Sequence, residues 1–300
     1  MGRRPTLRQL VIFVTEKCFR QPERSLTLLM KRKLIMKKLT LTILLIATLS
    51  TTACSEQKIN EWACGKEFGQ TRCLNLAEKA YNNKDYETFK KLLEISANYG
   101  NAQSQAQLGI FYQQTDEKLG EKDYQKALYW LQKSAEQGNK YGQSALGDMY
   151  AGAWGVKQDD TQAVKWYQKA AEQNEKEAQY HLGYMYAKGK GVQQDYIQAN
   201  EWFKKSANQG FAFAEHGLGI SYNNGWGVEK DYTLAFQWFE KAANQGHASS
   251  LYAVAEMYEQ GQGVEKNLTK AKEYYTQACK LEKQKVCENL DNFGKEDFKI

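Results

Sequence analysis

A unit of about 36 residues recurs between residues 101 and 282, and it constrains the fold of this chain more than any other feature. Leu-Gly pairs, with one Val-Ala variant, begin 38, 36, 36 and 36 residues apart, at Leu108, Leu146, Leu182, Leu218 and Val254. Gly-Val pairs and aromatic residues keep the same step, at Gly155, Gly191, Gly227 and Gly263 and at Trp130, Trp166, Trp202, Trp238 and Tyr274. A repeat of this length predicts a solenoid, which usually offers a binding surface and says little about chemistry.

Each repeat is consistent with two helices joined by a glycine turn. In the third repeat we expect helices over 175–188 and 196–209, with the turn at 189–192. Asp195 stands where a side-chain oxygen caps the second helix, and Gly210 stands where that helix closes. Trp202 and its equivalents are expected on the buried face of the second helix, in the core of the solenoid and among small residues. The periodicity therefore predicts an all-α chain.

The register also sets the expected boundaries. The five repeats should cover 101–138, 139–174, 175–210, 211–246 and 247–282. Residues 73–100 match part of the repeat and are interpreted as an N-terminal capping helix pair, whereas 283–300 should form a C-terminal capping helix and tail. Residues 54–72 are interpreted as a tether.

Residues 36–53 have the form of a secretion signal. A short basic start precedes an apolar run at 39–49 that is too short to span a membrane. After the run comes Thr-Thr-Ala-Cys at 51–54, which resembles a lipoprotein cleavage box with Thr where Leu is usual. That resemblance implies acylation of Cys54 and, because Ser55 is not Asp, an outer-membrane lipoprotein that faces the periplasm. A secreted or soluble periplasmic protein is the alternative.

Charge separates the leader from the remainder of the chain. Residues 1–53 hold 11 Lys/Arg and 2 Asp/Glu, so residues 54–300 hold 30 and 33. The near-neutral mature part gives no reason to expect nucleic-acid binding, and the N-terminal lipid is its expected contact with a membrane. Residues 1–35 are interpreted as an over-called start or as an extended basic region before the signal.

Export to an oxidising compartment changes the interpretation of the cysteines. Four remain besides Cys18 and Cys54, namely Cys64, Cys73, Cys279 and Cys287. Pairing of near neighbours, Cys64 with Cys73 and Cys279 with Cys287, would staple the two ends of the array. Because no zinc-type spacing occurs among them, we expect no metal site.

The repeat residues resemble those of the Sel-one-like repeat family, a relative of the tetratricopeptide solenoids. The pattern is carried in the third repeat by Ala178, Leu182, Gly183, Tyr186, Gly189, Gly191, Val192, Asp195, Ala199, Trp202 and Gly210. Departures from it include Ala153 and Asn174 in place of glycines. The resemblance implies a right-handed α/α superhelical solenoid of about five repeats with capping helices. The eight-residue step from Cys279 to Cys287 also resembles the cysteine-rich secreted branch of this family.

Two sets of residues are candidates for partner binding. In related solenoids the first helix of each repeat lines the concave wall, which here would carry Tyr141, Asp148, His181, Tyr184, Phe213 and Ile220. Two loop residues, Trp154 and Trp226, lie two repeats apart on one edge. Packing between repeats, or folding back of the loops over their own hairpins, would give these side chains structural roles instead.

The sequence favours a non-enzymatic scaffold that binds a protein or peptide. It shows no phosphate-binding loop after a strand, and we expect no cofactor. The mature chain has one S-x-x-K motif, Ser55 to Lys58, beside the lipid anchor and outside the repeats. Two alternatives stay open. The cysteine-rich branch implies a β-lactamase or penicillin-binding hydrolase, and a narrower binding role is that of an immunity protein against a secreted antibacterial effector.

Overall fold

The computed structural model describes residues 70–114 and 121–281. Within these ranges it has twelve helices and no strand, which confirms the all-α repeat solenoid. Two helices, α4 (Gln70–Asn82) and α5 (Tyr86–Asn98), precede the repeats. In the described part of the chain, every helix is too short or too polar to cross a bilayer. The expected leader and C-terminal cap lie outside the described residues, as does the expected tether up to residue 69. The last three tether residues, 70–72, instead begin helix α4.

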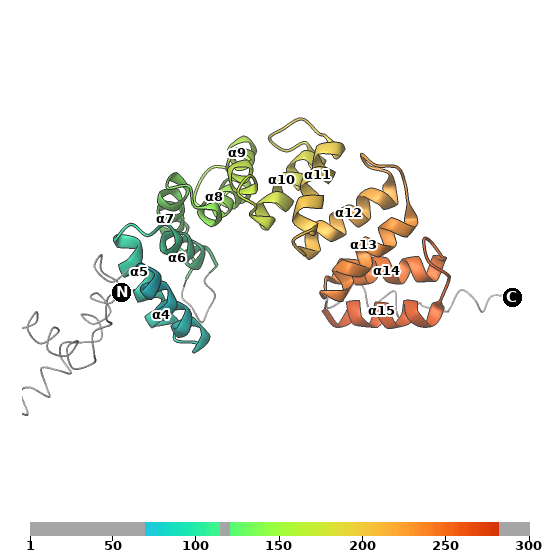
Figure 1. The fold of residues 1–300 in the computed structure, drawn as a ribbon, viewed down its shortest axis with the longest axis horizontal. Helices are drawn as coiled ribbons and strands as arrows, with labels where there is room; N and C mark the ends of the chain where they lie inside the picture. Colours follow the sequence, from blue (N-terminus) through green and yellow to red (C-terminus); the bar gives the residue numbers. More distant parts are fainter. Residues whose placement is uncertain (1–69, 115–120, 282–300) are drawn as a thin grey trace, which may run out of the picture.

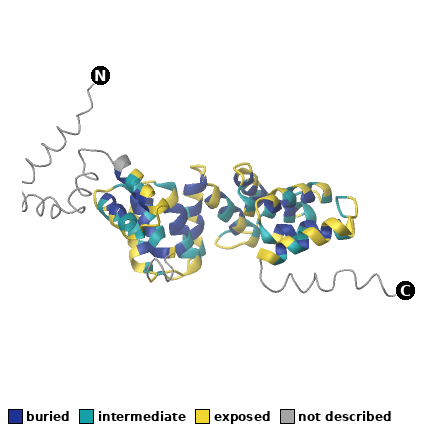
Figure 2. Cartoon of the chain, turned by 90° about the horizontal axis from the view of Figure 1, so that it is seen from below, coloured by how far each residue is buried: buried dark blue, intermediate teal, exposed yellow. Residues whose placement is uncertain are grey.

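Each repeat contributes one A helix and one B helix. The A helices are α6 (Ala102–Gln114), α8 (Lys140–Gly152), α10 (Lys176–Lys188), α12 (Ala212–Asn224) and α14 (Ala248–Gln260). The B helices are α7 (Tyr124–Glu136), α9 (Asp160–Ala171), α11 (Tyr196–Ala207), α13 (Tyr232–Asn244) and α15 (Leu268–Leu281). Figure 1 shows the pairs stacked into an arch, with α6 and α8 on its inner side and α7 and α9 on its outer side. In Figure 2 the buried segments run through the middle of the stack, and the exposed ones lie at loops and edges.

The helix ends follow the expected chemistry. Asp195 accepts hydrogen bonds from the backbone N–H groups of Ile197 and Gln198, and equivalent aspartates cap α9 and α13. The A helices α10, α12 and α14 end at left-handed glycines. Ala153 (φ 58°) and Asn174 (φ 58°), which stand where the family pattern has glycine, hold the same left-handed conformation.

The glycine of each Leu-Gly pair allows an A helix to touch the B helix of its own repeat. A Cβ on Gly183 would lie 2.7 Å from Cδ1 of Phe203, and one on Gly219 would lie 2.4 Å from Cδ1 of Phe239. The leucines before these glycines are fully buried. The pair therefore supplies both the core side chain and the space for the ring opposite it.

The tryptophans do not fill the centre of the core, so that expectation is wrong. Each is half-buried, and the following residue (Leu131, Tyr167, Phe203 or Phe239) is the buried one. A lysine three residues on covers each indole ring. The ammonium nitrogen of Lys205 lies 3.7 Å from the ring centroid of Trp202, and that of Lys241 lies 4.0 Å from that of Trp238. The tryptophans seal the edge of the core and place their outer face under a charged cover.

The glycine of each Gly-Val pair docks one repeat onto the one before it. Gly191 (φ 69°) lies against the first residue of α9, where an added Cβ would come 2.3 Å from the carbonyl oxygen of Asp160. Gly227 and Gly263 lie in the same way on the first residues of α11 and α13. Backbone thus rests on backbone at these joints, which no side chain would permit.

A ladder of buried amides also joins the repeats, and the sequence analysis missed it. The side chain of Gln179 donates to the carbonyl of Ala171 (3.1 Å) in the preceding repeat and accepts from Gln209 (2.8 Å), which follows the B helix of its own repeat. Gln143 and Gln105 make the same two kinds of bond one and two repeats earlier, respectively. Glu215 takes this place in the fourth repeat, where it accepts from Gln245 (2.6 Å). Their shared step of 38 and 36 residues was visible in the sequence.

The ends of the described array each carry a cysteine in a disulfide. Cys73 on α4 is fully buried, and Cys279 lies on α15. The partner of each lies outside the described residues. The pairings Cys64–Cys73 and Cys279–Cys287 therefore stay predictions.

Candidate functional site

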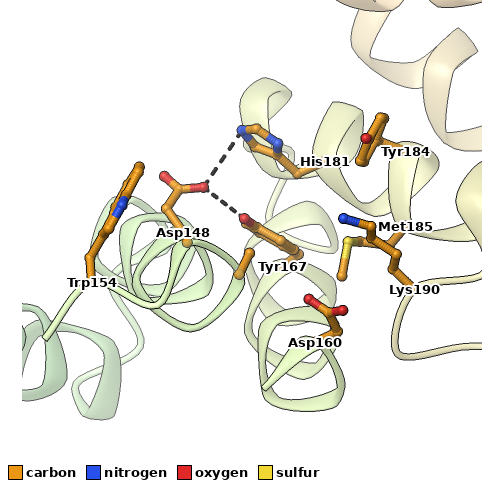
Figure 3. Close-up of a pocket in the computed structure, with 10 residues that line it drawn as sticks. Asp148, Trp154, Asp160, Tyr167, His181, Tyr184, Met185 and Lys190 are labelled. Carbon is orange, nitrogen blue, oxygen red and sulfur yellow. Dashed lines mark hydrogen bonds and ion pairs between the residues drawn. The ribbon is translucent and has the colours of Figure 1, made fainter. Parts of the chain in front are cut away.

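A pocket of about 270 Å³ lies between the second and third repeats. It is lined by ten residues drawn from α8, α9, α10 and two loops: Asp148, Ala151, Gly152, Trp154, Asp160, Tyr167, His181, Tyr184, Met185 and Lys190. Four of them were candidates from sequence, three on the expected wall and Trp154 on the loop edge. Figure 3 shows Asp148, His181 and Tyr167 directed toward one another, with Trp154 on one side and Lys190 on the other. The wall and the loop edge thus meet at one site.

Tyr167 holds Asp148 in place. The ring of Tyr167 is buried against Gly147, where an added Cβ would come 2.6 Å from Cε1. Its hydroxyl donates to Oδ1 of Asp148 at 2.7 Å (Figure 3). Oδ2 of Asp148 has no hydrogen bond to the described residues and is turned toward the Trp154 side of the pocket. Sequence analysis missed Tyr167 because the repeat marked the preceding tryptophan as the core residue.

Burial raises the pKa of Asp148 to about 6, the largest effect on this carboxyl. The hydrogen bond from Tyr167 lowers the pKa and the nearby carboxylate of Glu175 raises it further. Asp148 is therefore mostly ionised at neutral pH and mostly protonated about one unit below its pKa.

His181 completes the polar side of the pocket. Its Nε2 lies 3.6 Å from Oδ1 of Asp148, and its ring stacks on that of Tyr167 with centroids 5.0 Å apart. Burial lowers the pKa of His181, against the opposing effects of Glu177 and Glu175. The imidazole is therefore neutral at neutral pH, and it leaves the charge of Asp148 uncompensated.

No other pair of successive repeats combines side chains like Asp148 and Tyr167 of the second repeat with one like His181 of the third. The positions equivalent to Asp148 hold Ile110, Tyr184, Ile220 and Glu256, and those equivalent to His181 hold Gln107, Ala145, Gly217 and Ala253. Only the fifth repeat also has tyrosine at the place of Tyr167. Because the scaffold repeats and this group does not, the group is the best candidate for a specific function among the described residues.

The two loop tryptophans pack back onto the solenoid. Trp154 stacks on Tyr124 with ring centroids 6.2 Å apart, and Trp226 stacks on Tyr196 at 5.3 Å. Both stay 39–40% exposed. Trp154 lines the pocket, whereas Trp226 does not. Each loop tryptophan thus stacks on the B helix of the preceding repeat, whereas the expected folding back was over its own hairpin, and each indole stays partly exposed.

The other wall candidates lie outside the pocket. Tyr141 and Phe213 are exposed, and Phe213 belongs to an aromatic cluster with Tyr180, Phe211 and His247. Ile220 is half-buried against the core of the last two repeats. Tyr141 and Phe213 remain free to contact a partner, whereas Ile220 has mainly a packing role.

A second polar cluster joins α12 to α14, and sequence analysis did not foresee it. Nδ1 of His216 and Nδ1 of His247 lie 2.8 Å and 2.9 Å from the hydroxyl of Ser250. Burial, with a contribution from His247, lowers the pKa of His216 to about 4. Because Nδ1 of His247 also accepts from the backbone N–H of Ser250, this histidine caps α14 and is structural.

The pocket combines carboxyl, imidazole, ammonium and aromatic side chains in its lining. Its lining includes no serine, threonine or cysteine. In the part of the chain that the structure describes, no three His, Cys, Asp or Glu side chains are grouped to hold a metal ion. What the pocket offers is a carboxylate with a free oxygen beside aromatic faces, an arrangement suited to a cation.

Comparison with known proteins identifies the repeats. The Sel1 repeat family model matches five segments, residues 102–139, 140–175, 176–211, 212–247 and 248–282, each within one residue of the expected boundaries. No curated protein matches the chain.

Solved structures share the architecture. A protective antigen of uropathogenic Escherichia coli with an SLR fold is 28% identical with a TM-score of 0.67, over 82% of this chain and 53% of the antigen. A Sel1 repeat protein from Oxalobacter formigenes is 29% identical with a TM-score of 0.66, over 73% and 87%. An immunity protein from Pseudomonas aeruginosa, 19% identical with a TM-score of 0.50 over 73% and 86%, is similar in fold alone. This chain thus spans about half the length of the antigen.

Proposed function

The chain belongs to the Sel1 repeat family, and on that premise we propose that it is a non-enzymatic scaffold whose solenoid binds a protein or peptide on its inner wall. The observation that carries the proposal is the row of exposed aromatic side chains on the A helices. Tyr141, Tyr184 and Phe213 are 42%, 37% and 50% exposed on α8, α10 and α12. Aromatic side chains left open to water on successive repeats favour contact with a macromolecule.

The absence of serine, threonine and cysteine from the pocket lining supports binding over hydrolysis. The Ser55 to Lys58 motif lies outside the described residues and far in sequence from the pocket. A β-lactamase would need such a pair within a shaped cavity. Turnover of nitrocefin by the purified protein, abolished by one point substitution, would contradict a purely binding role.

Affinity capture tests the inner wall. We expect the chain from Cys54 onward to retain a partner from periplasmic extract, and the double variant Tyr184→Ala/Phe213→Ala to lose it by about tenfold or more, because two central aromatic contacts each contribute about 1 kcal/mol or more. The measurement is the amount of partner recovered, quantified by mass spectrometry.

The matched control removes similar side chains from B helices. Tyr129→Ala/Ile197→Ala truncates two exposed apolar residues on α7 and α11, and we expect unchanged capture. Equal loss in both double variants, or loss in neither, would rule out the inner wall as the binding face. Recovery of a secreted antibacterial effector would identify the narrower role of an immunity protein.

We further propose that the scaffold is held at the outer membrane by acylation of Cys54 and faces the periplasm. The apolar run at 39–49 and the Thr-Thr-Ala-Cys at 51–54 support this location. Mass spectrometry of the mature N-terminus should find acylated Cys54, and Cys54→Ser should move the protein from the membrane to the soluble fraction. An unmodified Cys54 in a soluble protein would contradict the anchor.

A further inference from the structure

We propose that the pocket between the second and third repeats takes an arginine side chain of the partner, with the guanidinium group paired to Oδ2 of Asp148 beside the aromatic faces of Trp154 and His181. This inference rests on the proposed binding function and names the chemistry that one subsite recognises. The pocket, of about 270 Å³, has room for one long side chain. It opens beside Tyr184, one of the exposed aromatics on the inner wall.

Asp148 presents one free carboxylate oxygen to the pocket. Tyr167 occupies Oδ1 from the buried side at 2.7 Å, and His181 lies near the same oxygen at 3.6 Å. Oδ2 is left without a hydrogen bond to the described residues and is turned toward the Trp154 side (Figure 3). A fixed carboxylate with one free oxygen in a concave site is a ready acceptor for a charged N–H donor.

Negative charge exceeds positive charge around the carboxylate of Asp148. Four carboxyl groups and two ammonium groups line the pocket or interact with Asp148 or its acidic neighbours: Asp148, Asp160, Glu175 and Glu177 against Lys176 and Lys190. Lys190 lies on the side opposite Trp154 (Figure 3). The excess of negative charge attracts a cation, and Lys190 directs it toward the Asp148 side.

The aromatic lining of the pocket favours arginine over lysine. Aromatic rings of Trp154, Tyr167, His181 and Tyr184 line the pocket. A planar guanidinium can stack on such faces while its N–H groups reach a carboxylate in the ring plane, and it is more weakly hydrated than an ammonium group. The stacked arrangement of His181 on Tyr167 already shows that flat groups pack in this space.

The pH dependence follows from the groups that face Asp148. These are Tyr167 and Asp160 of α9, Glu175, Glu177 and His181 at the start of α10, and Lys190 of the following loop. As the pH falls through about 6, Asp148 takes up a proton, and His181, whose pKa is lowered by burial, also gains charge on acidification. Both changes remove the attraction for a cation, so arginine binding should weaken on acidification.

A small probe tests the pocket apart from any partner. The full-length mature protein is titrated with Nα-acetyl-arginine amide and with its neutral isostere Nα-acetyl-citrulline amide, and the indole N–H signal of Trp154, assigned with Trp154→Phe, is followed by NMR. We expect the arginine probe to bind about tenfold more tightly than citrulline at neutral pH. This preference should disappear in Asp148→Asn and fall from about tenfold to about twofold one unit below the pKa of Asp148, where about a tenth of this carboxyl remains ionised.

Glu172→Gln is the matched control, since it removes an exposed carboxylate of the second repeat that does not line the pocket. We expect it to keep the arginine preference. Equal binding of the two probes, or equal loss in Asp148→Asn and Glu172→Gln, would overturn the proposal. The probe titration and the capture experiment test different proposals. If the pocket binds the probe but the protein captures no partner, the arginine site stands and the proposed function is wrong.

Discussion

Gly191→Ala is expected to lower the free energy of unfolding by about 3 kcal/mol or more. A left-handed alanine costs about 1 to 2 kcal/mol, and overpacking adds a further 1 to 3 kcal/mol. The added Cβ would come 2.3 Å from the carbonyl oxygen of Asp160, which is backbone and cannot rotate away. Urea denaturation followed by circular dichroism measures the loss.

Gly210→Ala separates the two contributions. Gly210 has a similar φ of 73°, but an added Cβ would meet nothing within 4 Å. This variant should lose only the conformational part, about 1 kcal/mol. If the two variants were equally stable, the docking of the loop glycine on α9 would not contribute to holding the repeats together.

Gln179→Met should lower the free energy of unfolding by about 2 kcal/mol. Methionine has nearly the same shape, so the change removes the amide and leaves the packing in place. The bonds from Gln179 to Ala171 and from Gln209 to Gln179 are lost, and polar groups next to the buried thioether lose a partner. The same urea denaturation measures the effect.

Glu215→Gln is the control of opposite sign at the equivalent position. Burial raises the pKa of Glu215, so the ionised side chain is disfavoured by folding at neutral pH. Glutamine would keep the acceptor for Gln245 and add a donor for the carbonyl of Ala207, and we expect a gain of about 1 kcal/mol. The gain should shrink at acidic pH, where Glu215 is protonated. A loss of stability in this variant would mean that the ladder does not join the repeats.

The architecture was predictable because local chemistry repeats with the period. Asp195 caps its helix and Gly183 makes room for a ring, and each follows from one residue type at one position. The buried residue next to each tryptophan was not predictable in this way. Which of two adjacent apolar residues faces the neighbouring helix depends on the rotation of the pair, which the period leaves unspecified.

The candidate site was predictable in part. Spacing of three and four residues placed Asp148, His181 and Tyr184 on one wall. It could not show that Tyr167 reaches across from α9 to hold Asp148, nor that the Trp154 loop closes the same pocket. Those relations depend on how three helices from two repeats meet. The breaks in the repeat at these positions were the available signal.

Helices in this solenoid pack mainly against their neighbours along the chain. Such a stack is elastic, because a small change of angle at each joint adds to the next and no contact among the described helices bridges the two ends of the arch. A ligand seated between the second and third repeats would stiffen one joint and thereby reset the distance between the tips. The affinity for a long partner then depends on how much bending the partner imposes.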